Sequence, residues 1–114
     1  MLPKKNRLSS KIDIERVKAH GSLSNSKNFK LIILSQEDTS DSRFSSIVSN
    51  NVSKKAVIRN KIRRAIRSSV RKNLSNAAKG FDCLFIAKFS ATTLTNSEIE
   101  QEIEKLLLNE KIIN

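Results

Sequence analysis

Residues 42–81 constrain this chain more than any other part of it. The stretch contains no Asp or Glu, although it holds 11 of the chain's 22 Lys and Arg residues. If residues in this stretch form a helix, their apolar and cationic side chains fall on opposite sides of that helix. We predict one amphipathic helix over residues 54–74, with an apolar side suited to packing on a sheet. The apolar side consists of Ile58, Ile62, Ala65, Ile66, Ser69 and Val70, and the cationic side of Lys61, Arg63, Arg64, Arg67, Arg71 and Lys72.

The cationic side of this helix predicts a partner rich in phosphate. Arg59, Arg63 and Arg67 follow one another at four-residue intervals, and each such like-charged pair costs about a few tenths of a kcal/mol. A face selected only for solubility normally includes acids as well. The net charge of +11 on 114 residues strengthens the same positive field. Because the planar guanidinium group binds phosphate through two hydrogen bonds and stacks on bases, we expect structured RNA as the partner.

Three other interpretations of the basic helix compete with RNA binding. They are a solvated charged face, a helix lying on an anionic membrane surface, and a DNA-reading helix-turn-helix. A solvated face rarely excludes acids over so long a stretch. A membrane-surface helix usually carries Trp, Phe or Leu on its apolar side, whereas this one carries Ile, Val and Ala. The flanking segments favour strands, which argues against a helical DNA-binding domain.

The rest of the chain predicts an α+β fold, a small single-domain sandwich of sheet and helices. Capping signals at Ser10 and Thr95 open two further helices, over residues 11–19 and 96–108, and we expect Gly21 to end the first one in a left-handed conformation. Apolar runs at residues 29–34, 44–48 and 83–89 predict strands. The order is therefore helix, two or three strands, basic helix, strand, helix. The remaining segments are a basic arm at residues 1–8, a polar turn at 22–28, a loop at 36–42 and a frayed tail at 109–114.

Length and cysteine content predict one domain without covalent or metal cross-links. A chain of 114 residues suits a single RNA-binding domain with one core. The lone Cys83 cannot form an internal disulfide, and neither it nor the single His20 belongs to a cluster with metal-ligand spacing. No apolar run reaches the roughly 18 residues of a membrane span or forms the core of a signal peptide. We expect a soluble cytoplasmic protein that contacts no membrane and binds no cofactor by itself.

Residues 53–67 resemble the signature helix of the bacterial ribonuclease P protein component family. In that family an Arg-Asn pair, here Arg59-Asn60, precedes a basic residue, an Ile or Leu, and two further basic positions. The resemblance covers nearly the whole chain in the same order. It includes the start at Asn6-Arg7-Leu8, the short helix ending at His20-Gly21, the strands at residues 29–34 and 82–88, and the opening of the last helix at Leu94-Thr95.

This resemblance implies a left-handed β-α-β crossover and a role in tRNA 5′ maturation. The protein would be the non-catalytic subunit of a ribonucleoprotein endoribonuclease. One protein would bind one large catalytic RNA and the 5′ leader of precursor tRNA, and the RNA with its Mg²⁺ ions would remove the leader. The family pattern places on the RNA-binding helix the residues Lys54, Lys55, Arg59, Asn60, Lys61, Arg63, Arg64 and Arg67.

Two departures from the family pattern concern contacts with RNA. Many members carry two aromatic residues on the first helix, and the corresponding positions here are Ile14 and Lys18, so base stacking from this helix is not expected. Before the basic helix, Asn50-Asn51 stands where many members have a basic pair. The two Asn side chains can still form hydrogen bonds with phosphate or sugar, but they supply no charge. Phe29 and Phe89, both at strand ends, are the aromatic candidates that join Ile14 and Lys18 in the predicted leader-binding cleft.

A protein-only nuclease is not predicted, because the chain offers no catalytic constellation. Asp38 and Asp41 lie in a polar loop, and the four glutamates at residues 98–104 suit the solvated side of a helix rather than a metal site. His20 precedes a helix end, where a capping role is ordinary. Cys83 lies in an apolar strand, where a thiol is usually a small buried hydrophobe.

A ribosomal protein or an RNA chaperone is the alternative from another functional class. Composition alone does not separate it from a ribonuclease subunit, because such proteins are also small and basic. The Arg59-Asn60 helix, placed among strands in this order, favours the ribonuclease subunit.

Overall fold

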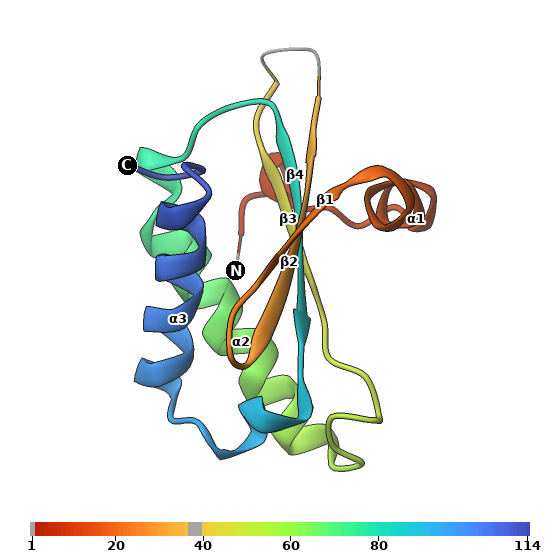
Figure 1. Ribbon diagram of the computed structural model, residues 1–114, viewed down its shortest axis with the longest axis vertical. Coiled ribbons are helices and arrows are strands. Elements are labelled where there is room, and N and C mark those ends of the chain that lie inside the picture. Colours follow the sequence, from red (N-terminus) through yellow and green to blue (C-terminus); the bar gives the residue numbers. More distant parts are fainter. Residues whose placement is uncertain (1, 37–39) are drawn as a thin grey trace.

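The computed structural model describes residues 2–36 and 40–114 and contains a four-stranded sheet (Figure 1). The strands are β1 (Ser22–Asn25), β2 (Phe29–Ser35), β3 (Arg43–Ile47) and β4 (Phe81–Ala87), and they lie in the order β1-β2-β4-β3. β2 pairs antiparallel with β1 and β4, whereas β3 is parallel to β4. Parallel neighbours require a crossover, and here it contains helix α2 (Ala56–Lys72). The left-handedness of this crossover stays a prediction.

Helices cover both faces of the sheet. α1 (Lys11–His20) lies on one face, and α2 and α3 (Asn96–Asn109) lie on the other (Figure 1). The described residues also form three short 3₁₀ helices, namely η1 (Lys4–Asn6), η2 (Leu74–Asn76) and η3 (Phe89–Thr93). The predicted α+β sandwich and its order of elements are confirmed. Within residues 2–36 and 40–114, no helix is both long enough and apolar enough to cross a membrane.

Side chains along the two central strands, β2 and β4, point alternately to the two faces of the sheet and so divide the core into a larger and a smaller part. Phe29 of β2 and Phe85 of β4 are fully buried in the larger part, between the sheet and the pair α2 and α3. On the opposite face, Leu84 packs with Leu8 and with Val17 of α1 in the smaller part. Val17 is the single buried residue of α1, so α1 is held to the sheet by little apolar surface.

α2 confirms the predicted amphipathic pattern. Five of the six side chains assigned to its apolar side are buried, and Ile58 is half-buried. The helix begins two residues later and ends two residues earlier than predicted. Lys55 is its N-cap and Lys54 precedes it, so the prediction that these two lysines lie within the helix is wrong. They extend its cationic side from the preceding loop.

Two predictions around the end of α1 are wrong. The predicted polar turn at residues 22–28 contains β1, a short edge strand that pairs antiparallel with β2. Gly21 has φ −75° and ψ 161°, which is extended and not left-handed backbone. A glycine is required there by close approach, because a Cβ would lie 2.5 Å from Cγ2 of Ile32 and 2.6 Å from the carbonyl oxygen of Val17.

The segments near both ends of the chain pack onto the domain. Leu8 is buried, and its amide donates to the carbonyl oxygen of Phe44 at 3.0 Å. The predicted basic arm therefore runs along the outer edge of β3 and covers part of it. The predicted frayed tail is wrong, because Ile112 and Ile113 are buried in the larger part of the core.

Candidate nucleic-acid interface

The outward side of α2 and the loop before it carry a row of cations together with the amide of Asn60, which we call the basic face. All eight residues predicted from the family pattern belong to it. The predicted residues in the loop lie next to those on the first turns of α2, because the loop leads directly into the helix. The basic face comprises the exposed Lys54, Lys55, Asn60, Lys61, Arg64 and Arg71 and the half-buried Arg59, Arg63 and Arg67.

Two arginines of the basic face also anchor the loop that precedes α2. Nη1 of Arg59 donates to the carbonyl oxygen of Ser53 at 2.9 Å. Arg63 donates through Nη1 to Oδ1 of Asn60 at 2.8 Å and through Nη2 to the carbonyl oxygen of Val48 at 3.1 Å. A guanidinium group has further N–H donors, so both arginines retain donors for phosphate. Because their side chains are already oriented, binding of an anion would cost them less conformational entropy.

Carboxylates neutralise little of this charge. Within the described part of the chain, the one α2 cation in an ion pair is Lys72, whose Nζ lies 2.7 Å from Oε1 of Glu100 on α3. The hydrogen bond from Lys72 lowers the pKa of Glu100. The other cations of α2 direct an uncompensated positive potential into solvent, which attracts polyanions.

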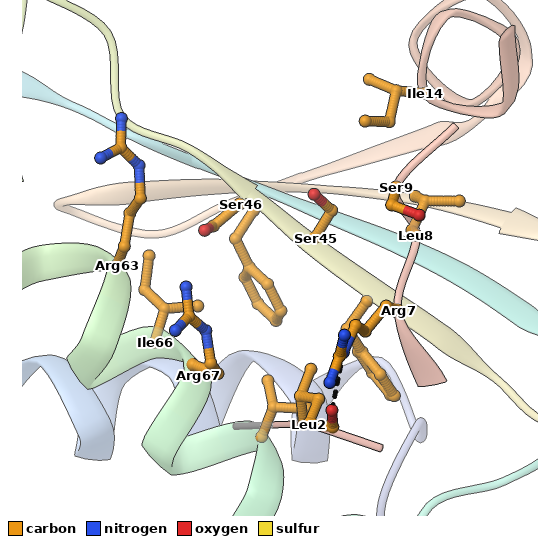
Figure 2. A pocket seen from close by; sticks show the side chains of 13 residues that line it. Leu2, Arg7, Leu8, Ser9, Ile14, Ser45, Ser46, Arg63, Ile66 and Arg67 are labelled. Atoms are coloured by element: carbon orange, nitrogen blue, oxygen red, sulfur yellow. Dashed lines mark hydrogen bonds between the residues drawn. The ribbon is translucent and has the colours of Figure 1, made fainter. Parts of the chain in front are cut away.

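A groove of about 350 Å³ lies beside the basic face and along β3; we call it the β3 groove. Figure 2 shows Arg63 and Arg67 of α2 on one side of it and Arg7 of the N-terminal segment on the other, with Ser45 and Ser46 of β3 between them. Nε of Arg7 donates to the carbonyl oxygen of Leu2 at 2.7 Å, so this arginine is also oriented. The apolar side chains that line the groove are Leu2, Leu8, Ile14, Phe44, Ile66, Val70 and Phe85.

The four residues predicted for a leader-binding cleft do not come together. Ile14 lines the β3 groove, whereas Lys18 is exposed and pairs with Glu15 at 3.9 Å. Phe29 is fully buried in the larger part of the core, on the face of the sheet opposite to Ile14, so its assignment to a cleft is wrong. Phe89 is 72% exposed, but it follows the end of β4 that lies away from α1. The strand registers, which local sequence does not reveal, separate these positions.

The chemistry-bearing side chains outside the basic face are scattered. Within residues 2–36 and 40–114, no group of three or more His, Cys, Asp and Glu side chains gathers where a metal ion could bind. Asp38 lies outside the described residues. Cys83 is buried, and burial raises the pKa of its thiol, with the neighbouring Asp82 adding to the effect. The thiol is therefore protonated at neutral pH and unsuited to nucleophilic attack.

Sequence reasoning did not find the buried charge that ties α1 to the sheet. Asp82 of β4 is fully buried and accepts hydrogen bonds from Arg43 of β3, at 2.9 Å from Nε and 2.8 Å from Nη2. Arg16 of α1 reaches the same carboxylate at 3.4 Å, and Arg43 also donates to Asp13 of α1 at 3.1 Å. Hydrogen bonding to Asp82 raises the pKa of Arg43. In the sequence, Asp82 is recognisable only as an acid next to an apolar strand. That position does not indicate which arginines pair with it.

Comparison with known proteins identifies the family to which a chain with this fold and this basic face belongs. Residues 2–111 match the Ribonuclease P family model. The chain belongs to the ribonuclease P protein family. The ribonuclease P protein component of Pseudanabaena sp. is 30% identical to it over 114 residues, which cover 100% of this chain and 98% of the relative. The ribonuclease P protein component of Clostridium novyi is also 30% identical over 114 residues, with 99% of this chain and 100% of the relative covered.

Solved ribonuclease P proteins share the fold. The Staphylococcus aureus protein superimposes with a TM-score of 0.88 at 27% identity, covering 97% of this chain and 100% of that chain. The Thermotoga maritima protein, at 23% identity and a TM-score of 0.75, supports the fold alone. The chain is accordingly the protein subunit of a ribonucleoprotein endoribonuclease of tRNA 5′ processing, and its partner is ribonuclease P RNA. A ribosomal protein or RNA chaperone is not favoured.

Proposed function

We propose that the basic face binds ribonuclease P RNA directly. The observation that carries this proposal is the row of exposed cations on α2 without carboxylate partners among the described residues. Phosphate contacts of this kind supply affinity and orientation without reading sequence. Because Arg59 and Arg63 are held by backbone carbonyls, they act as fixed contact points at the start of the helix.

The β3 groove suits the 5′ leader of precursor tRNA. Arg7, Arg63 and Arg67 offer charge to phosphates, and the apolar lining offers a surface to bases. The hydroxyl groups of Ser45 and Ser46 lie between the arginines, within reach of a sugar or a base edge (Figure 2). The groove adjoins the basic face, so one RNA-bound protein would also hold the substrate strand.

In this mechanism the protein binds and orients while the RNA performs the cleavage. One protein would bind one RNA in the cytoplasm, and Mg²⁺ held by the RNA would supply the activated water for cleavage of the phosphodiester. The protein lowers the Mg²⁺ requirement, because its cations offset part of the repulsion between catalytic RNA and substrate.

Cleavage of a 5′-extended precursor tRNA by the cognate ribonuclease P RNA at low Mg²⁺ tests the proposal. The protein should stimulate cleavage with the RNA and cut nothing alone. Arg64→Ala should weaken RNA binding and reduce the slope of log affinity against log salt by about 1. Lys105→Ala on the exposed side of α3 is the matched control, since it removes one positive charge from outside the basic face. Equal behaviour of the two variants would refute the assignment of the basic face.

The leader assignment is tested separately with Arg67→Ala. This variant should lose more affinity for precursor tRNA with a long leader than for mature tRNA, both measured on the assembled holoenzyme. Arg71→Ala, on the same helix but outside the β3 groove, should show no such difference. Equal losses of Arg67→Ala for the two tRNAs would show that the groove does not hold the leader.

A further inference from the structure

We propose that Phe89 is a stacking platform for an unpaired base of ribonuclease P RNA. This inference rests on the proposed function of the basic face and extends it with a contact of different chemistry. Among the five phenylalanines, Phe29, Phe44 and Phe85 are buried and Phe81 is half-buried, but Phe89 is 72% exposed. Its exposed ring contributes little to the core and is free to meet a partner.

The backbone that carries Phe89 is firmly anchored. Just before it, the amide of Lys88 donates to the carbonyl oxygen of Asn28 at 2.9 Å, and Nζ of Lys88 donates to that of Ser26 at 2.7 Å. Just after it, Ala91 is fully buried, and Oγ1 of Thr92 donates to the carbonyl oxygen of Phe89 at 2.9 Å. The ring therefore projects from a fixed turn, which limits the entropy lost on stacking.

The position of η3 suits an RNA that lies along α2. β4 and α2 run in opposite senses, so η3 follows β4 at the end of the molecule where α2 begins (Figure 1), and η3 contacts α2. The exposed cations Lys54 and Lys55 lie at the start of α2. Val57, in the first turn of α2, is 76% exposed and adds apolar surface at this end.

One carboxylate near the turn that carries Phe89 is already engaged. Glu102 of α3 accepts hydrogen bonds from the hydroxyl of Ser26 and, at 2.9 and 2.6 Å, from the amide and Nδ2 of Asn28. It serves to fix the turn between β1 and β2. An exposed aromatic ring at the same end of the molecule as exposed lysines is a combination suited to single-stranded nucleic acid, with the ring taking a base and the lysines taking phosphates. Ribonuclease P RNA is the polyanion that the proposed function brings to this side of the molecule.

Phe89→Trp provides a direct test, because the chain contains no Trp or Tyr and its fluorescence would come from this one site. Binding of ribonuclease P RNA should quench the emission. Ile12→Trp is the matched control, since Ile12 is 80% exposed on α1, outside the basic face, and should not be quenched. RNA binding without quenching at residue 89 would overturn the inference, while failure of the unmodified protein to bind would overturn the proposed function itself.

Affinity measurements separate stacking from charge and from mere burial. Phe89→Ala and Phe89→Leu should weaken binding about 5- to 150-fold, whereas Phe89→Tyr should retain it. The salt slope should stay unchanged, in contrast to Arg64→Ala, and the melting midpoint should stay that of the unmodified protein. Unchanged affinity of Phe89→Ala would refute the proposal. So would quenching of the tryptophan that appears only when precursor tRNA is added, since it would assign the platform to the substrate.

Discussion

The buried carboxylate of Asp82 should contribute more to stability than any surface ion pair of this protein. Asp82→Asn keeps the shape of the side chain but replaces a charged acceptor of three guanidinium hydrogen bonds by a neutral amide. Removing one partner of a buried pair costs about 3–5 kcal/mol. Arg43 and Arg16 keep 27% and 46% of their side-chain surface exposed, and both also contact Asp13, so water and Asp13 offset part of the loss. We expect a decrease of about 2–3 kcal/mol in the free energy of unfolding.

Urea unfolding followed by circular dichroism measures this decrease. A loss of this size corresponds to a fall of about 10 °C in Tm for a domain of this length. Asp41→Asn is the control, because Asp41 forms a mostly exposed pair with Lys5 at 3.9 Å and should change stability by less than about 1 kcal/mol. If Asp82→Asn and Asp41→Asn are equally stable, the buried network does not hold α1 to the sheet. A double variant with Arg43→Gln should lose less than the sum of the two single variants.

Three further predictions follow from local contacts. Gly21→Ala should lower the free energy of unfolding by about 1–3 kcal/mol in urea titrations, because the added Cβ meets Ile32; an unchanged midpoint would show that this contact relaxes freely. The Cys83 thiol, whose pKa is raised by burial, should react with a thiol reagent only as fast as the protein unfolds, and rapid labelling in native buffer would contradict this. Hydrogen bonds from Thr95 lower the pKa of Glu98, so its stabilisation is complete above the ordinary glutamate pKa and is lost as pH falls through the lowered value. Thermal melts at pH 6 and pH 3 should therefore differ less for Glu98→Gln than for the unmodified protein.

Strong local periodicity explains which elements were predictable from sequence. The alternation of apolar and cationic residues fixes α2 to within two residues at each end, and the Thr95 capping box fixes the start of α3. β1 has no such pattern, since its residues are largely polar and exposed, and it is a strand only because β2 lies beside it. Burial of Ile112 and Ile113 is likewise a tertiary effect, because the chain turns back onto the core after α3.

The candidate site was predictable where it lies on one helix and unpredictable where it joins distant segments. The cations of the basic face follow from the spacing within α2. The β3 groove places Arg7 across from Arg63 and Arg67, and this juxtaposition depends on a backbone bridge between Arg7 and Phe44. Phe29 shows the same limit, because its burial is set by the face of β2 on which it lies.

The packing of α2 explains how the chain can maintain a face of repelling charges. Burial of Ile62, Ile66 and Val70 contributes about 1.5–3 kcal/mol for each side chain. The repulsion within each pair of arginines four residues apart costs about 0.2–0.5 kcal/mol, so packing outweighs repulsion several-fold. The free energy that holds the helix therefore comes from one side, and the charge that we propose binds RNA lies on the other. Arg64→Ala should accordingly leave the Tm unchanged or raise it slightly while it weakens RNA binding. A fall in Tm that parallels the loss of affinity would show that the two sides are not independent.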